Sequence, residues 1–136
     1  MRELTARISE SSCEHVVLDM EAGVEHLSRG TARNTDTLLV IAEPYYKSLE
    51  TAARVAMLGR ELGIPRVLTL ANKVRPADKE SVDQFAQRHG IELIEEIPYD
   101  ESVAEADRLG IAPTDHDVNS AMVRTIDSLT GRLLER

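Results

Sequence analysis

Polar side chains that can bind a metal, a phosphate or a base follow the apolar runs of this sequence. Asp19 ends the run His15–Leu18, and Glu21, Ala22 and Gly23 come next. A carboxylate in this place can orient a hydrated Mg²⁺, because that ion keeps most of its waters and needs few protein ligands. A nearby glycine lets a backbone N–H approach a terminal phosphate. An aspartate after an apolar run is common, and a carboxylate that caps the next helix is the competing interpretation.

Two further groups occupy similar positions later in the chain. Asn72 and Lys73 follow the apolar run 66–71, and the amide of Asn72 offers a donor and an acceptor that can read the edge of a purine. Pro98, Tyr99 and Asp100 follow the run 91–97, where they can form a wall of the same pocket. The alternatives are an ordinary Asn-Lys turn, and a rigid turn with Asp100 as a helix cap.

The elements that must position these residues alternate between strands and helices. Four strands are expected, at 15–19, 37–42, 66–71 and 91–94, with Glu43-Pro44 ending the second. Five helices are expected, at 2–12, 48–62, 77–89, 100–110 and 116–134, with Ser48 as a cap and a loop from 20 to 34. This order predicts an α/β fold with a parallel sheet and right-handed crossovers. Functional residues of such sheets gather at the carboxyl ends of the strands.

Composition narrows the class of protein. The 136 residues predict a single domain, 1–136, and a 42% hydrophobic content with 3% aromatics predicts an aliphatic interior. A net charge of −8 argues against a nucleic-acid scaffold, and no apolar run approaches a membrane span of about 18 residues. The single cysteine, Cys13, rules out an internal disulfide, and no signal-peptide core is present. We therefore expect a cytoplasmic protein with neither nucleic acid nor membrane as a partner.

A family resemblance is carried by three stretches: VVLDMEAGVEHLSRGTARNTDTLLVIAEPYYKSLETA, then LANKV, then IPYDESVAEADRLGIAP. Together they resemble the second half of the MinD/ParA class of P-loop ATPases, over about residues 14–130. Within that class the chain is similar to the accessory ATPases that insert nickel into carbon monoxide dehydrogenase, and DMEAGVEHLSRGT is the most specific part. The resemblance implies a parallel β-sheet flanked by helices, a P-loop NTPase (Rossmann-like) fold without its amino-terminal phosphate-loop portion.

The resemblance also implies roles for individual residues and the cofactors ATP and Mg²⁺. Asp19 corresponds to the Walker B aspartate that holds magnesium through water, and Gly23 to the glycine that senses the γ-phosphate. Asn72 corresponds to the adenine-reading asparagine, and the segment Pro98, Tyr99 and Asp100 to the loop that lines the base. The turn Glu43-Pro44 matches a structural turn of the family.

The sequence departs from the family pattern in its phosphate and nickel sites. It contains no Gly-rich loop with Lys and Ser/Thr and no switch I segment, and neither Gly23 nor Gly30 lies in a Gly-Lys-Thr context. The nickel-binding Cys-x-Cys pair near the family's dimer interface is reduced to Cys13, and one thiol cannot form a closed soft-metal site, although a dimer can bring two together. The four histidines, His15, His26, His89 and His116, show no ligand spacing.

Three functional hypotheses follow. The leading one is the carboxyl-terminal half of a nickel-insertion ATPase (a truncated product, a fragment or half of a split protein), which works as a homodimer or with a chain that carries the phosphate loop. Its implied client is carbon monoxide dehydrogenase, and alone it is expected not to hydrolyse ATP. The second is a non-catalytic interaction module that retains the fold. The third is a receiver-like signalling domain, whose acidic pocket Asp19, Glu21 and Lys73 imitate, although no further aspartate ends a middle strand.

The family resemblance makes one prediction about the sheet. In that family the strand that bears the phosphate loop lies between the strands that correspond to 15–19 and 37–42. Without it both strands lose a shared neighbour, and unpaired strand edges favour association. We therefore expect the two strands to pair directly, or another chain to fill the gap.

Overall fold

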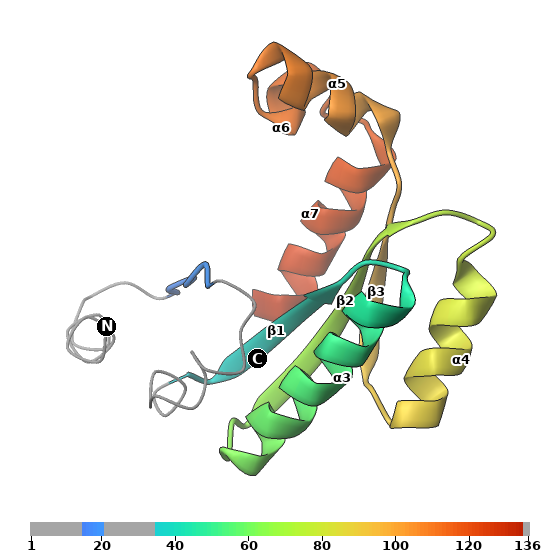
Figure 1. Cartoon of the computed structure of the whole chain (residues 1–136). Helices are drawn as coiled ribbons and strands as arrows, with labels where there is room; N and C mark the ends of the chain where they lie inside the picture. Colours follow the sequence, from blue (N-terminus) through green and yellow to red (C-terminus); the bar gives the residue numbers. More distant parts are fainter. Residues whose placement is uncertain (1–14, 21–34, 135–136) are drawn as a thin grey trace.

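The computed structural model describes residues 15–20 and 35–134, and the first helix or strand among these residues begins at residue 37 (Figure 1). The elements are β1 (Thr37–Ala42), α3 (Tyr46–Glu61), β2 (Arg66–Val74), α4 (Lys79–His89), β3 (Leu93–Pro98), α5 (Glu101–Leu109), α6 (Pro113–His116) and α7 (Ala121–Leu134). Strands and helices alternate through β3, as the sequence predicts.

The three strands form one parallel sheet in the order β1-β2-β3. The β1–β2 ladder runs without interruption from Thr37 opposite Arg66 to Ala42 opposite Ala71. The β2–β3 ladder is irregular at two places, between Thr69 and Leu70 and between Ala71 and Val74, and Val74 lies opposite Pro98. The parallel arrangement confirms the predicted fold class and brings the carboxyl ends of all three strands to one edge.

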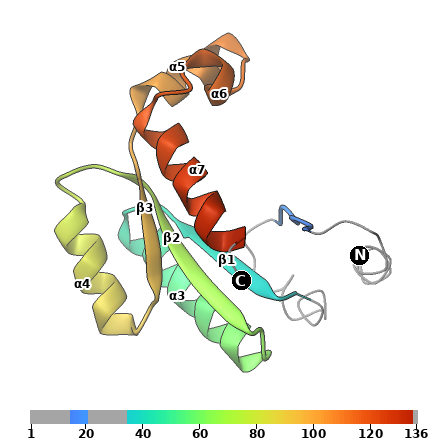
Figure 2. The same cartoon turned by 180° about the vertical axis from the view of Figure 1, so that it is seen from behind.

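Helices cover both faces of the sheet, with α3 and α4 on one face and α7 on the other (Figures 1 and 2). Alternate residues of β2 supply the two cores, because successive side chains of a strand point to opposite faces. Val67 packs in the cluster with α3 and Phe85, whereas Leu70 packs with Ile97 and Leu129 of α7. Helices α5 and α6 lie beyond the carboxyl ends of the strands, at the top of Figure 1.

Helix ends follow the expected sequence signals. Gly90 and Gly110 follow α4 and α5 with φ of 61° and 68°, a left-handed conformation that glycine adopts without steric cost. Asp100 is the N-cap of α5. Ser48, in contrast, lies in the first turn of α3 and does not cap it, because Tyr45 is the N-cap residue and makes no side-chain cap bond.

The prediction of a buried strand at 15–19 is wrong. Residues 15–20 have no regular structure, and the side chain of Val17 is 93% exposed. A strand needs a neighbour to pair its backbone N–H and C=O groups, and no described strand lies beside this segment, since β1 pairs with β2 alone among the described strands. Direct pairing of 15–19 with 37–42 is therefore also contradicted. The expected helix 2–12, Cys13, Gly23 and the rest of the loop 21–34 lie outside the described residues.

Two other boundaries differ from the sequence prediction. The last helix was expected at 116–134, but α7 begins at Ala121, and Asp117 before it is extended (φ −148°, ψ 94°). A separate short helix, α6, begins at Pro113, a position where the missing N–H of proline costs no hydrogen bond. Strand β2 continues to Val74, so Asn72 and Lys73 lie inside the strand and do not form a turn after it. None of the described helices is long and apolar enough to cross a membrane.

Candidate functional site

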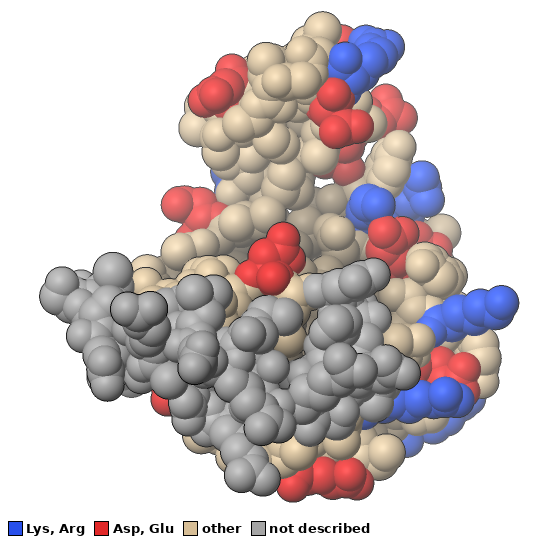
Figure 3. Space-filling model, turned by 60° about the vertical axis from the view of Figure 1, so that its left-hand side comes forward, with Lys and Arg blue, Asp and Glu red and all other residues tan. Residues whose placement is uncertain are grey.

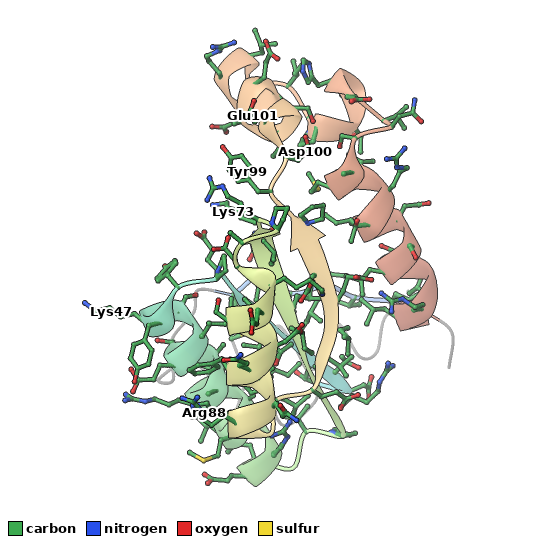
Figure 4. All side chains as sticks on the ribbon, turned by 90° about the vertical axis from the view of Figure 1, so that its right-hand side faces the viewer. Lys47, Lys73, Arg88, Tyr99, Asp100 and Glu101 are labelled. Carbon is green, nitrogen blue, oxygen red and sulfur yellow. The ribbon has the colours of Figure 1, made fainter. Side chains whose placement is uncertain are left out.

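The carboxyl edge of the sheet brings together polar groups from all three strands. Glu43 follows β1, Asn72 and Lys73 lie near the end of β2, and Tyr99 and Asp100 follow β3. Figure 4 shows Lys73, Tyr99 and Asp100 at this edge, below α5. The sequence placed these residues at strand ends, and the parallel sheet makes them neighbours. Asp19, in contrast, is exposed in a segment outside the sheet, and Gly23 lies outside the described residues.

Asn72 presents an amide whose oxygen is bonded to the next residue. Its Oδ1 accepts a hydrogen bond from the Lys73 backbone N–H at 3.0 Å. That oxygen has a second lone pair, and the Nδ2 group brings two donors. The half-buried amide can therefore offer both a donor and an acceptor to a planar ligand.

Lys73 is held in an uncommon backbone conformation beside an acidic partner. Its φ is 58°, which costs a residue with a Cβ about 1–2 kcal/mol. Its Nζ lies 2.8 Å from Glu43 Oε1, and this hydrogen bond, followed by the charge of Glu43, raises the pKa of Lys73 above its usual value. The two side chains are 56% and 40% exposed, so the pair stabilises the fold by about 1 kcal/mol or less.

Tyr99 makes one backbone hydrogen bond, and an arginine side chain packs against its ring. Its N–H donates to Val74 O at 3.0 Å, and the guanidinium carbon of Arg75 lies 4.0 Å from the ring centroid. The side chain remains 39% exposed, so it can offer an aromatic surface on which a base stacks. Sequence reasoning missed Arg75, since its contact with Tyr99 depends on the spatial register of β2 and β3.

Asp100 is occupied by structural hydrogen bonds. Its Oδ1 accepts from the Ser102 backbone N–H at 3.0 Å and from Ser102 Oγ at 2.7 Å, and its Oδ2 accepts from Met122 N–H at 3.1 Å. The Ser102 hydroxyl and then the Met122 N–H lower the pKa of Asp100. The capping interpretation is confirmed, and both oxygens of this carboxylate are engaged in hydrogen bonds within the chain.

Charge and metal-binding groups are dispersed over the described part of the chain. Acidic and basic side chains are interspersed on the face shown in Figure 3, where the described atoms form no continuous basic surface. Within residues 15–20 and 35–134, no group of three or more His, Cys, Asp and Glu side chains is placed to hold a metal ion. The middle strand of the described sheet ends on Val74 and brings no aspartate to the edge, which disfavours the receiver-like hypothesis.

Proteins similar in sequence to this chain include some that are described as ATP-binding. The carbon monoxide dehydrogenase accessory protein CooC of Rhodospirillum rubrum is 36% identical over 141 residues, which cover 100% of this chain and 51% of that protein. An uncharacterized ATP-binding protein of Methanocaldococcus jannaschii is 34% identical over 125 residues, 90% of this chain and 49% of that protein. This chain is homologous to about half of each of these proteins, which supports its resemblance to the MinD/ParA class. No protein-family model matches it.

The structural comparison shows that the chain has a MinD-like fold. The MinD cell division protein of Aquifex aeolicus superposes with a TM-score of 0.81 over 99% of this chain and 59% of that one, at 18% sequence identity. The predicted P-loop NTPase-like α/β fold is thereby confirmed. The chain spans about half the length of the curated relatives it matches.

Proposed function

We propose that this MinD/ParA-class chain binds the adenine base of ATP at the carboxyl edge of its sheet, as the carboxyl-terminal half of a maturation ATPase. The observation that carries the proposal is that the Asn72 amide and the ring of Tyr99, which Arg75 contacts, stand near the carboxyl ends of the neighbouring strands β2 and β3. The ATP-binding proteins among its relatives support the choice of nucleotide.

The proposed recognition uses the two functions of the Asn72 amide. Asparagine pairs with adenine by donating to N7 and accepting from the N6 amino group. The Nδ2 group supplies the donor, and the second lone pair of Oδ1 supplies the acceptor. Tyr99 offers a stacking surface worth about 1–3 kcal/mol per base, and Pro98 holds the start of its loop in the ladder.

We propose that two residues near the amino terminus of the chain, Asp19 and Gly23, serve the magnesium and phosphate functions. Asp19 carries an exposed carboxylate, a ligand type that suits a hydrated Mg²⁺, and Gly23 would bring an N–H to the γ-phosphate. A bound Mg²⁺ would neutralise phosphate charge. Because Asp19 lies outside the sheet, we propose that a second copy or a complementing chain with a phosphate loop completes the site.

The same relatives suggest which enzyme this protein serves and where in the cell it acts. CooC is an accessory protein of carbon monoxide dehydrogenase, and we propose a related maturation role, with nickel as cargo, in the cytoplasm. Cys13 supplies one thiol, so a nickel site would need a second thiol from another copy.

Replacing Asn72 tests base recognition. In the complemented protein, Asn72→Ala should weaken ATP binding by about 1–3 kcal/mol, because a buried donor and acceptor on the base lose their partner. Isothermal titration calorimetry measures the change, with Gln87→Ala as the control, since Gln87 is an exposed amide in the last turn of α4. Equal affinity in Asn72→Ala and the parent would remove Asn72 from the site.

Hydrolysis is the second test. We expect the 136-residue chain by itself to release no phosphate from ATP, because phosphoryl transfer needs groups that position and neutralise the β- and γ-phosphates. Asp19→Ala serves as the control for contaminating activity. Magnesium-dependent turnover that Asp19→Ala abolishes would contradict this expectation.

One observation favours the non-catalytic alternative. Both oxygens of Asp100 are used to hold α5 and α7, a role that serves the fold without any ligand. If the complemented protein binds neither ATP nor ADP, the chain is an interaction module that retains the fold.

A further inference from the structure

The middle strand carries one extra residue at its carboxyl end. Ala71 lies opposite Glu96 and Val74 opposite Pro98, so three steps along β2 face two along β3. This is a β-bulge, which bends a strand and changes the direction of the side chains beside it. The residues within the bulge are Asn72 and Lys73.

Lys73 occupies a position in the bulge that suits glycine. Its φ of 58° is the one positive value among the described non-glycine residues. Bulges with a left-handed residue commonly place glycine there, because a Cβ atom crowds the neighbouring carbonyl. A lysine at this position therefore needs contacts that favour the left-handed conformation.

Two hydrogen bonds meet this need. The Nζ of Lys73 donates to Glu43 Oε1 at 2.8 Å, and the backbone N–H of Lys73 donates to Asn72 Oδ1 at 3.0 Å. Glu43 is itself fixed, because its backbone N–H donates to Ser48 Oγ of α3 at 3.0 Å. A continuous set of contacts thus runs from α3 through the end of β1 to the amide of Asn72.

We propose that Lys73 is a positioning residue, whose ion pair with Glu43 holds the bulge left-handed and so fixes the Asn72 amide with its Nδ2 group toward the base. This inference rests on the proposed function, because it names what orients the base-reading amide. An exposed ion pair contributes little to global stability, so its effect is on the conformation of the bulge.

The first experiment uses the 136-residue chain without nucleotide. Nuclear magnetic resonance gives the backbone conformation of residue 73 from its HN–Hα coupling and carbon shifts, and the environment of Asn72 from its side-chain amide shifts. Glu43→Gln and Lys73→Met should move residue 73 out of the left-handed region and shift the Asn72 amide signals. Lys73→Gly should leave the Asn72 signals near their wild-type positions, because glycine adopts this conformation without the ion pair.

A matched control separates this effect from the loss of any exposed ion pair. Lys79 Nζ lies 2.6 Å from Glu96 Oε2, but Lys79 has ordinary helical backbone at the start of α4. Lys79→Met should therefore leave residue 73 and the Asn72 amide unchanged. Wild-type signals in both Glu43→Gln and Lys73→Met would overturn the proposal.

The second experiment titrates ADP into the complemented protein, which carries the same substitutions and is compared with its complemented parent. Lys73→Met should bind at least about twofold more weakly than the parent, the lower limit for residues that are coupled through contact, and Lys73→Gly should bind like the parent. Lys73→Met should add no further loss in an Asn72→Ala background, and an additive loss would overturn a role through Asn72. If the parent does not bind ADP, the proposed function fails in this chain, while the nucleotide-free spectra still decide the positioning role.

Discussion

At the residue scale, Asp100 joins the starts of two helices through a single carboxylate. It caps α5 through Ser102 and also accepts from the N–H of Met122 in α7. Asp100→Ala should lower the free energy of unfolding by about 1–2 kcal/mol, as loss of an N-cap does. Urea unfolding measures this, with Asp107→Ala as the control, because Asp107 is exposed in the same helix. A loss no greater than in the control would show that the carboxylate does not hold these helices.

The same carboxylate predicts a pH dependence. Hydrogen bonds from Ser102 and Met122 lower the pKa of Asp100 below its ordinary value of 3.8. A lowered folded-state pKa adds stability that is present above the unfolded pKa and is lost as pH falls through the folded one. The destabilisation by Asp100→Ala should therefore be larger at pH 7 than at pH 2. An equal loss at both pH values would contradict a role for the charge.

Part of this edge was predictable from the sequence. Asn72 and Tyr99 follow apolar runs, and strand ends of a parallel sheet share one edge, so their approach was expected. The Glu43–Lys73 ion pair and the Arg75–Tyr99 contact were not, because they depend on strand register and on a bulge. A register shift of one residue reverses the side-chain directions, and a single sequence does not show it.

At the element scale, local sequence signals predicted where helices end better than they predicted which strands pair. Gly90 and Gly110 stop α4 and α5 as their neighbours in sequence indicate. The apolar run 15–19 indicated a strand but could not say which strand it would pair with, and residues 15–20 have no regular structure. Charge pairs between elements, such as Arg132 of α7 with Glu95 of β3, also follow from packing.

Replacing two helical glycines by alanine should change the stability of the protein in opposite directions. A Cβ at Gly59 would lie 2.7 Å from Leu38 Cδ2 and 3.3 Å from Val67 Cγ2, where α3 packs on β1 and β2, whereas a Cβ at Gly131 in α7 meets nothing within 4 Å. Gly59→Ala should destabilise, because overpacking costs about 1–3 kcal/mol against a helix-propensity gain of about 1 kcal/mol. Gly131→Ala should stabilise by about 0.5–1 kcal/mol. Thermal unfolding of both variants checks the signs, and stabilisation by Gly59→Ala would show that α3 does not pack closely.

At the scale of the whole molecule, β1 is the edge strand at which a further chain is expected. Within the described residues it pairs on one side, with β2, and Ile41 at its end is 58% exposed. Unpaired edges of this kind recruit other strands. We expect residues 37–42 to be protected from hydrogen exchange in a concentration-dependent manner, either by self-association or by a complementing chain. A monomer by sedimentation in which 37–42 exchange freely would contradict this.

Photolabelling with 2-azido-ADP tests whether the base binds at the carboxyl edge of the sheet, because the azide reports where the base lies. We expect mass spectrometry to find the label on Tyr99 or on residues 72–75, excess ADP to compete it away, and Asn72→Ala to reduce it. Label confined to other residues, or label at this edge that ADP does not displace, would contradict binding of the base at the carboxyl edge of the sheet.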